Sequence, residues 1–470
     1  MGRIGANISG IELKLLNRWA QANAAVTLNS LRLASGAKIA SPRDNPSGFV
    51  NLSGLQGDLS TVKATLANVT AASGLVAQTQ LVLDQIRTQL NTVRTKALAD
   101  QDQALTADER AANQAAIDAA IAKLDTLAAS DVGGRRMLDG SANFTFAGIN
   151  TSQVANVDVI SLGDAASQTI SGAVTVAATQ AQLVHTEAGG SISNNATFSL
   201  TGDRGSASID VTSGESLSTV ATRINQESHL TGVLASVAGN DLQLTSIEYG
   251  TAAQVGVEVT SGTFAVTGGS AGTDYGADGT ATIDGQSVTG DGNRFSLNSN
   301  RFQFSIEFQP NFTGAFSTIT ATGKALTFAL TTDLNRTSTL ALPSVYAANL
   351  GGLSGNLAQL ATGGAVAGLG ANAPQAVRIV DEALASVTRL DGRVDGFANE
   401  VVAASSNSLS GIQTVLENSI DAVNRVDDNE ELLLLTKNQA LASNALAALS
   451  VLDAQRASMI AMIRKIAGRN

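Results

Sequence analysis

The stretch "LASGAKIASPRDNPSGF", residues 33–49, interrupts sequence that favours helix on both sides. It contains Gly36, Pro42, Pro46 and Gly48, and thus two of the five prolines in the chain. Glycine and proline are the strongest helix breakers, and the Ser, Asp and Asn residues between them favour turns through side-chain hydrogen bonds. The stretch therefore predicts that a first helix ends here and that a second helix begins directly afterwards.

The segment before this break carries apolar residues at steps of three and four. Such spacing is typical of the packing seam of a coiled coil. The seam residues that we expect to mediate helix packing are Ile4, Ile8, Ile11, Leu15, Trp19 and Val26. Further leucines widen the apolar stripe, so we expect this helix to have neighbours on more than one side.

The C-terminal segment shows the same pattern. Its expected packing residues are Leu441, Ala445, Ala448, Leu452, Met459, Met462 and Ile466. A helix that is apolar nearly all round must be buried, and each buried Leu or Ile contributes about 1.5–3 kcal/mol. Two interpretations remain: an ordinary helix pair inside a globular bundle, or a pair that other copies of the same chain cover. The width of both stripes favours the second interpretation.

Composition excludes several classes of protein. The chain has 470 residues, of which 44% are hydrophobic, and a net charge of −11, which argues against nucleic-acid binding. It has no cysteine, so disulfides and thiolate metal sites are excluded. The start "MGRIGANISGIELKLLNRWA" lacks the features of a cleaved secretory signal, and we expect no apolar run long enough to span a bilayer. We therefore predict no membrane partner.

The interior changes from helical to β patterning and back again. A helix over residues 50–100 is followed by "TADE", in which Thr106 and Glu109 can form a capping box. β patterns begin near residue 143, and residues 191–248 read as a β-β-α-β-β module with its helix near residues 215–227. Helical periodicity returns after Pro374. Because the chain goes out and comes back, its terminal helices should lie antiparallel.

Catalytic and metal-binding patterns are missing from this sequence. Its two histidines, His185 and His229, lie in Gly/Ser/Asn-rich β sequence, and we interpret them as exposed loop residues. Neither has the spacing of a zinc site, and the glycine loops lack the Lys-Ser/Thr pair of a phosphate cradle. We therefore expect no enzymatic activity, no cofactor and no metal.

Four local motifs resemble bacterial flagellin. They are "LNSLRLASGAKIASPRDNPSGF" at residues 28–49, "MLDGS" at 137–141, "AVNRVDD" at 422–428 and "TKNQALASNALAALSVLDAQ" at 436–455. The module at 191–248 resembles an insertion repeat found in many flagellins and hook-associated proteins. The resemblance is strongest over roughly the first 140 and the last 100 residues.

The resemblance implies an α+β multidomain fold. Long antiparallel terminal helices would form a coiled-coil inner domain and a helical bundle, with β-rich outer domains inserted between them. The expected domains are an inner-tube coiled coil (1–45 with 426–470), a helical bundle with β-hairpins (46–180 with 325–425) and an outer, surface-exposed β-rich part (181–324). The broken stretch would be the spoke that joins the inner helix to the bundle, with "NRVDDN" as its return strand. The expected spoke and turn residues are Gly36, Arg43, Asp44, Gly48, Arg425, Asp427 and Asp428.

The same resemblance implies a function. We expect a structural subunit that leaves the cell through the flagellar type III channel and self-assembles through its terminal helices into the extracellular flagellar filament. Its partners would be further copies of itself, hook-associated and cap proteins, and an export chaperone on the C-terminal helix. A hook–filament junction protein remains an alternative. A secreted glycan-binding adhesin is an alternative of another class, which predicts a stable monomer that stays active without its terminal helices.

Overall fold

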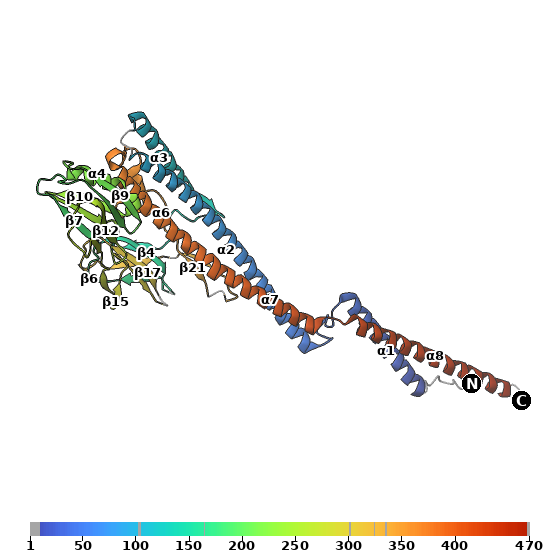
Figure 1. The fold of residues 1–470 in the computed structure, drawn as a ribbon. Coiled ribbons are helices and arrows are strands. Elements are labelled where there is room, and N and C mark those ends of the chain that lie inside the picture. Colours follow the sequence, from blue (N-terminus) through green and yellow to red (C-terminus); the bar gives the residue numbers. More distant parts are fainter. Residues whose placement is uncertain are drawn as a thin grey trace. The chain divides into compact units, whose positions relative to one another are not determined.

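The computed structural model describes residues 10–101, 105–163, 165–299, 302–323, 325–333 and 336–467, and only the backbone of residues 466 and 467. By its internal contacts the chain divides into two compact units, residues 1–67 with 406–470 and residues 68–405. The α+β architecture is confirmed: along the chain, long helices precede and follow a β-rich middle (Figure 1). The finer three-part division expected above stays a prediction.

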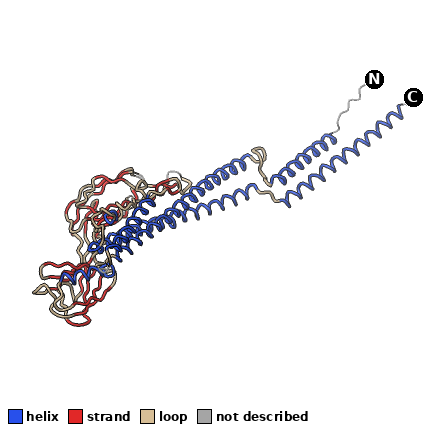
Figure 2. Tube along the Cα trace, turned by 90° about the horizontal axis from the view of Figure 1, so that it is seen from above, coloured by secondary structure: helices blue, strands red, loops and turns tan. Residues whose placement is uncertain are grey.

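The terminal unit consists of helices. Helix α1 (Gly10–Ser35) lies beside α8 (Asp428–Ala467), and both views of the chain show the two as neighbours (Figures 1 and 2). The first part of α2 (Pro46–Ala99) and most of α7 (Ala403–Asn424) complete this unit, where Lys63 Nζ on α2 lies 3.2 Å from Glu417 Oε1 on α7. Such an exposed ion pair contributes little by itself.

The predicted break between the first two helices is present. Gly36 adopts a left-handed φ of 68°, and its N–H donates to the carbonyl oxygen of Arg32, which is the usual glycine termination of a helix. Pro46 is the first residue of α2, where its missing N–H costs nothing. Between them the chain makes turns rather than helix.

The larger unit contains a helical part. It is formed by the rest of α2, by α3 (Ala107–Ala128) and by α6 (Ala373–Gly396), which continues into α7 through a π-helix, η3 (Phe397–Val402). The predicted capping box at α3 is confirmed, because Thr106 Oγ1 accepts from the N–H of Glu109 and the Glu109 carboxylate accepts from the N–H of Thr106. The buried faces of these helices include Leu83, Ile86, Leu90, Ile117, Leu124, Val380 and Val387.

A phenylalanine-rich β domain follows. Its sheets have the strand orders β15-β14-β6-β18, β16-β17-β4 and β3-β19-β5. The strands are β3 (Thr145–Ala147), β4 (Val154–Ser161), β5 (Ser167–Ile170), β6 (Gly172–Val176), β14 (Thr280–Ile283), β15 (Gln286–Thr289), β16 (Arg294–Asn298), β17 (Gln303–Phe308), β18 (Gly314–Ala315) and β19 (Ile319–Thr322). Six phenylalanines, Phe144, Phe295, Phe302, Phe304, Phe308 and Phe316, are buried in one core with aliphatic residues.

The β-β-α-β-β module is also present, within a slightly larger body that we call the insertion module (residues 181–266). Its hairpins belong to different sheets, with strand orders β10-β11-β7 and β13-β12-β8-β9. The elements are β7 (Gln182–Thr186), β8 (Ala196–Gly202), β9 (Ser206–Val211), α4 (Leu217–Gln226), α5 (Ser228–Thr231), β10 (Val233–Ala238), β11 (Asp241–Ser246) and β12 (Gln254–Gly262), with β13 (Thr273–Tyr275) at the edge. Apolar residues that alternate along the strands meet α4 in one core.

Short elements complete the larger unit. They are the hairpins β1–β2 (Asp131–Val132, Arg135–Arg136), β20–β21 (Leu326–Phe328, Ser338–Leu340) and β22–β23 (Gly351–Gly352, Gly355–Asn356), and the 3-10 turns η1 (Leu357–Leu360) and η2 (Gly370–Asn372).

The interpretation of the histidines as exposed loop residues is wrong. His185 lies in β7 and is only 4% exposed; its ring stacks on Phe264 with centroids 3.8 Å apart, and Nδ1 lies 2.7 Å from the carbonyl oxygen of Ala265. His229 is half-buried in α5. The alternation that places every second residue of β7 in the core also places His185 there, and the polar neighbours in sequence hid that pattern.

Candidate assembly surface and spoke

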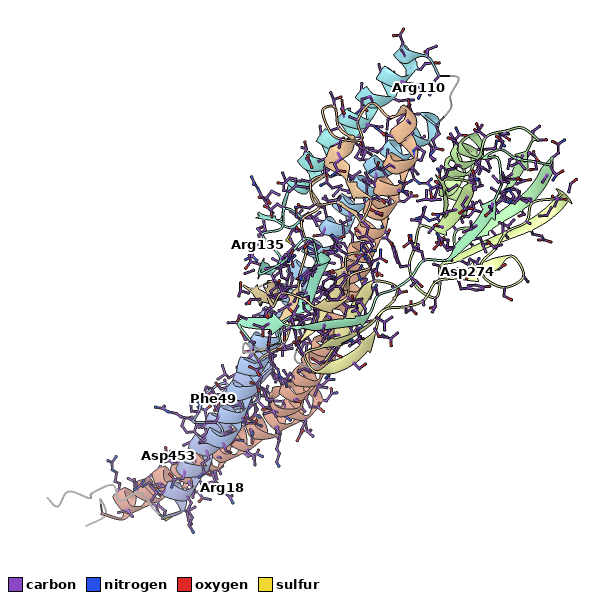
Figure 3. The ribbon with its side chains drawn as sticks, turned by 90° about the vertical axis from the view of Figure 1, so that its left-hand side faces the viewer. Arg18, Phe49, Arg110, Arg135, Asp274 and Asp453 are labelled. Carbon is purple, nitrogen blue, oxygen red and sulfur yellow. The ribbon has the colours of Figure 1, made fainter. Side chains whose placement is uncertain are left out.

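The contact between α1 and α8 is narrow. Ala22 on α1 and Ala445 on α8 are the buried apolar residues of the described pair, while Leu15, Val26 and Leu452 are half-buried. Ala448 is half-buried as well. Small residues at the centre let the two helices approach closely but bury little apolar area. Figures 1 and 3 show α1, with Arg18, running alongside α8, with Asp453.

Most of the apolar surface of these two helices is exposed in the single chain. Of the expected packing residues, Ile11, Trp19, Leu441, Met459 and Met462 are exposed, Met462 to 65%. Other large apolar side chains are exposed beside them, namely Leu13, Leu16, Leu28, Leu31, Leu432, Leu433, Leu446, Val451, Ile460 and Ile463. Ile4 and Ile8 lie outside the described residues, as does the side chain of Ile466.

The apolar length of α8 also corrects one expectation. By length and composition alone, two of the described helices, α2 and α8, could cross a membrane, whereas we expected no sufficiently long apolar run. The most apolar window of α8 has no buried share at all, and that of α2 is 28% buried. The expectation failed because it considered only the large apolar residues. Ala, Ser and Thr between them carry no charge, so the uncharged stretch is longer than the spacing of the large residues indicates.

A buried polar cluster joins α1 to α8. Asn29 and Glu431 are each only 5% exposed; Asn29 Nδ2 donates to Glu431 Oε1, and Asn29 Oδ1 accepts from Asn438 Nδ2 at 3.0 Å. Arg32 Nη1 lies 3.8 Å from the same Glu431 oxygen. A buried polar contact in a helix pair fixes register, because any slip leaves its groups without partners. We call these four residues the register cluster.

The residues of the register cluster were not among the expected site residues. The same is true of a second polar contact between α1 and α8. Arg456 Nη1 on α8 donates to Glu12 Oε1 on α1 at 3.3 Å. A sequence signal existed for the cluster, since Glu431 and Asn438 are one heptad apart on α8. It could not identify Asn29 as their partner, because that residue is 402 positions away from Glu431.

The spoke stretch is tied to the chain that returns before α8. The N–H of Lys38 donates to the carbonyl oxygen of Asn424 at 2.7 Å, and the N–H of Ile39 donates to Asn424 Oδ1 at 2.8 Å. In return, the N–H of Val426 donates to the carbonyl oxygen of Gly36 at 3.3 Å. The two breaks in the helices are therefore held together as a short two-stranded bridge.

Two of the expected spoke residues differ in what they do. Asp44 Oδ2 accepts from the N–H of Ser41 at 2.8 Å and from that of Ala40 at 3.1 Å, which closes the turn. These bonds, that from the Ser41 backbone first, hold the pKa of Asp44 below its ordinary value. Arg43 is exposed, and no hydrogen bond or ion pair of its side chain is found within the described residues.

Gly48 lies close to the ends of two side chains. A Cβ at this position would lie 2.7 Å from Ile39 Cδ1 and 2.7 Å from Asn45 Nδ2. Asn45 in turn caps α2, since its Oδ1 accepts from the N–H of Gly48 at 3.0 Å. Glycine therefore lets the buried Ile39 pack against the first turn of α2.

The return turn caps α8 in the same manner. Asp427 Oδ1 accepts from the N–H groups of Asn429 at 3.0 Å and Glu430 at 3.2 Å. Asp428 is the first residue of α8, where a negative charge interacts favourably with the helix dipole. Arg425 is exposed and lies 3.8 Å from Asp421, a weak surface pair.

Within the described part of the chain, no group of three His, Asp or Glu residues could hold a metal ion. The assembly surface instead offers apolar side chains around a register cluster. Such a surface can bind another surface of the same kind, and a chain that carries it twice can polymerise.

Comparison with known proteins gives two family matches. The family model of the bacterial flagellin N-terminal helical region matches residues 7–143, and the model of the flagellin hook IN motif matches residues 197–248. The first match contains α1, the spoke stretch, α2 and α3, and the second lies in the insertion module. No curated protein matches the sequence.

Solved structures of flagellar proteins show a weak likeness. The D1–D3 domains of the cap protein FliD from Escherichia coli are 18% identical, with a TM-score of 0.29; the match covers 51% of this chain and 65% of that one. FlgL from Xanthomonas campestris is 11% identical, with a TM-score of 0.29, and covers 78% of this chain and 99% of its own. Hook-associated protein-3 from Legionella pneumophila is 10% identical, with a TM-score of 0.31, and the shares are 79% and 98%.

These TM-scores are too low to support a conclusion about function. The two family matches need no such support, because they fall on the elements that carry the spoke and the insertion module. The chain thus matches models of the flagellin family in two places, the N-terminal helical region at residues 7–143 and the hook IN motif at residues 197–248.

Proposed function

We propose that this chain is a subunit of the flagellar filament that polymerises through α1 and α8 after export through the flagellar secretion channel. It acts outside the cell as a homopolymer and without catalysis. The observation that carries this proposal is the exposed apolar surface of the terminal helix pair. The same pair also holds a buried register cluster, which an unstructured tail would not need.

The energetics favour shelter by other copies. Fully burying a Leu, Ile or Met side chain contributes about 1.5–3 kcal/mol, so each half-exposed residue still offers on the order of 1 kcal/mol. Large apolar side chains are exposed along both α1 and α8, so their sum can exceed the entropic cost of association. Before assembly the same surface needs protection, which is the role we assign to an export chaperone on α8.

The decisive test compares two Leu→Asp variants of the full chain. Leu446 on α8 is 58% exposed, and Leu230 in α5 of the insertion module is 47% exposed. Both substitutions place a charge on an exposed leucine, and neither opens a core of the single chain. We expect wild type and Leu230→Asp to form filaments after salting out, seen by sedimentation and electron microscopy, whereas Leu446→Asp stays soluble. Filaments of Leu446→Asp in normal yield would contradict the proposal.

Two further readouts separate the competing functions. If α8 served as a membrane span, wild type would float with lipid vesicles instead of forming filaments. If the chain were a junction protein, antibody labelling of whole flagella would mark a single ring, whereas a filament subunit would be labelled along the filament. For a filament subunit, hook-associated and cap proteins would be the neighbours at the two ends of the polymer.

A further inference from the structure

The insertion module has a core of its own. Phe198, Ile209, Ile224 and Leu244 are buried in it, together with residues from the other strands and from α4. None of the described residues that form this core belongs to α2 or α6. The apolar core therefore holds the module together without extending into α2 or α6, and the module reaches α6 through α5.

The space between the module and the helices has a mixed polar and apolar lining. A cleft of about 790 Å³ lies there, lined by α4, β10 and β11 on one side and by the start of α6 and the end of α2 on the other. Amide and hydroxyl side chains predominate in its lining, for example Gln101, Gln180, Asn225 and Gln375. One long hydrogen bond spans this space, from Gln226 Nε2 on α4 to the carbonyl oxygen of Gln101 at 3.5 Å.

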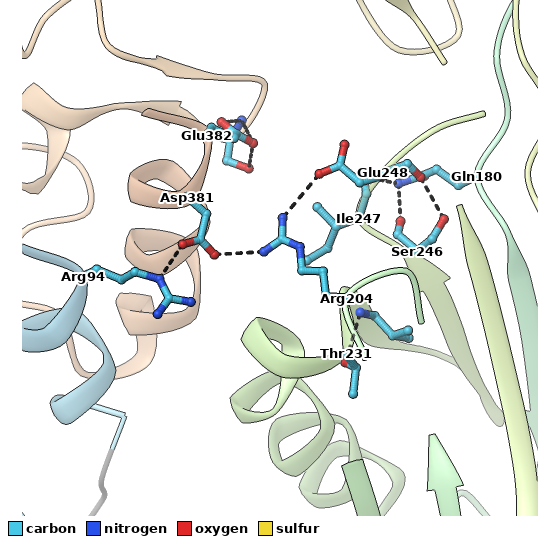
Figure 4. Close-up of polar contacts among 11 residues, drawn as sticks. Arg94, Gln180, Arg204, Thr231, Ser246, Ile247, Glu248, Asp381 and Glu382 are labelled. Carbon is cyan, nitrogen blue, oxygen red and sulfur yellow. Dashed lines mark hydrogen bonds and ion pairs between the residues drawn. The ribbon is translucent and has the colours of Figure 1, made fainter. Parts of the chain in front are cut away.

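An ion-pair bridge crosses beside this cleft (Figure 4). Arg94 Nε on α2 lies 2.6 Å from Asp381 Oδ1 on α6, and Arg204 Nη1 of the module lies 2.9 Å from Asp381 Oδ2. Arg204 Nη2 also lies 3.3 Å from Glu248 Oε1 just beyond β11. One carboxylate thus receives a guanidinium from each side, and its side chain is only 13% exposed.

Loss of the Asp381 charge would be felt on both sides. Arg94 and Arg204 would then face each other without the anion between them, and breaking such a partly buried pair costs more than forming it contributes. Burial lowers the pKa of nearby Arg378; the charge of Glu382 opposes this shift, and that of Arg204 adds to it. A rotation of the module away from the helices would then lower the electrostatic repulsion between Arg94 and Arg204.

We propose that Asp381 fixes the orientation of the insertion module on α2 and α6, and that ionic strength sets how firmly the module is held. At about 1 M salt the Debye length falls to about 3 Å, so partly exposed ion pairs weaken there. The module core is apolar and keeps its fold under the same conditions. The orientation of the outer module is then adjustable without unfolding.

The test uses the full chain, which lacks native cysteines. Spin labels on cysteines at the exposed positions Ser208 in β9 and Ala385 in α6 report the distance between module and helix. We expect a narrow distance distribution in the wild type at low salt that broadens at 1 M salt. Asp381→Asn should broaden and shift it already at low salt.

Asp391→Asn is the matched control. Asp391 lies on the same helix, and its Oδ2 lies 2.7 Å from Arg87 Nη2 of α2; among the described residues this ion pair does not involve the module. We expect its distribution to equal that of the wild type. An Asp381→Asn distribution identical to the wild type, or one equally broad in Asp391→Asn, would overturn the proposal.

A second variant keeps the test decisive if Asp381→Asn fails to fold. Arg204→Met removes only the module's charge, should give the same broadened distribution, and should add nothing when combined with Asp381→Asn. Folding of the module is followed through the ring signals of buried His185, one of only two histidines in the chain. If Arg204→Met left both the His185 ring signals and the width of the spin-label distance distribution unchanged, the role of the ion-pair bridge would be refuted.

Discussion

The terminal helix pair and the insertion module differ in how much of their apolar surface they bury. Both carry regularly spaced apolar residues, yet the module buries a complete core between two sheets and α4, whereas α1 and α8 together bury mainly Ala22 and Ala445. A sheet covered by a second layer can enclose an apolar face, but two single helices cannot cover each other on all sides. Within one chain, the module encloses its own apolar core, whereas the terminal pair leaves most of its large apolar side chains exposed.

The largest expected effect is in the closed region. Phe198→Ala removes a fully buried ring that stacks on Phe264 with centroids 4.2 Å apart, and such a cavity costs about 3–5 kcal/mol. We expect the module to unfold at a lower denaturant concentration. At denaturant concentrations below this unfolding midpoint, the variant should still polymerise. Leu446→Ala on α8 is the control, and it should leave module unfolding unchanged. Equal shifts for both variants would erase the proposed difference between the regions.

The next effect concerns the register cluster. Asn29→Ala leaves the buried Glu431 without its amide donor, which costs about 1–3 kcal/mol. Because 1.4 kcal/mol is a factor of ten in an equilibrium constant, we expect the critical concentration for polymerisation to rise about tenfold or more. Asn444→Ala, at an exposed position of α8, serves as the control. A critical concentration that is unchanged in Asn29→Ala would show that the cluster does not set register.

The smallest expected effect is on the pH dependence of the stability of the larger unit. Burial raises the pKa of Glu382, whose carboxylate accepts from the N–H and hydroxyl of Ser354. A raised pKa means that the stabilising contribution is complete below the ordinary value for Glu and is lost as pH rises through the folded-state value. Glu382→Gln should therefore flatten the pH dependence of thermal unfolding and raise the midpoint at neutral pH. A midpoint that falls at neutral pH would contradict this assignment.

Local signals predicted much of the fold. The helix break at Gly36, the capping box at Thr106 and the strands of the module all follow from residues that are neighbours in sequence. The contacts that complete the sites do not, because Asn29 meets Glu431 and Arg204 meets Asp381 only after distant segments pack. His185 was misjudged for the opposite reason, since its polar sequence neighbours concealed a buried strand position.

Methionine oxidation reports directly whether copies of the chain cover each other's terminal helices. Met459 and Met462 on α8 are both more than half exposed in the single chain, whereas Met137 is completely buried in the larger unit and serves as an internal reference. Peroxide treatment of the monomer and of the salt-induced polymer, followed by mass spectrometry, gives the oxidation rate of each residue. We expect fast oxidation of Met459 and Met462 in the monomer, strong protection in the polymer, and slow oxidation of Met137 in both. Equal rates for Met459 and Met462 in monomer and polymer would contradict the claim that copies of the chain cover each other's terminal helices.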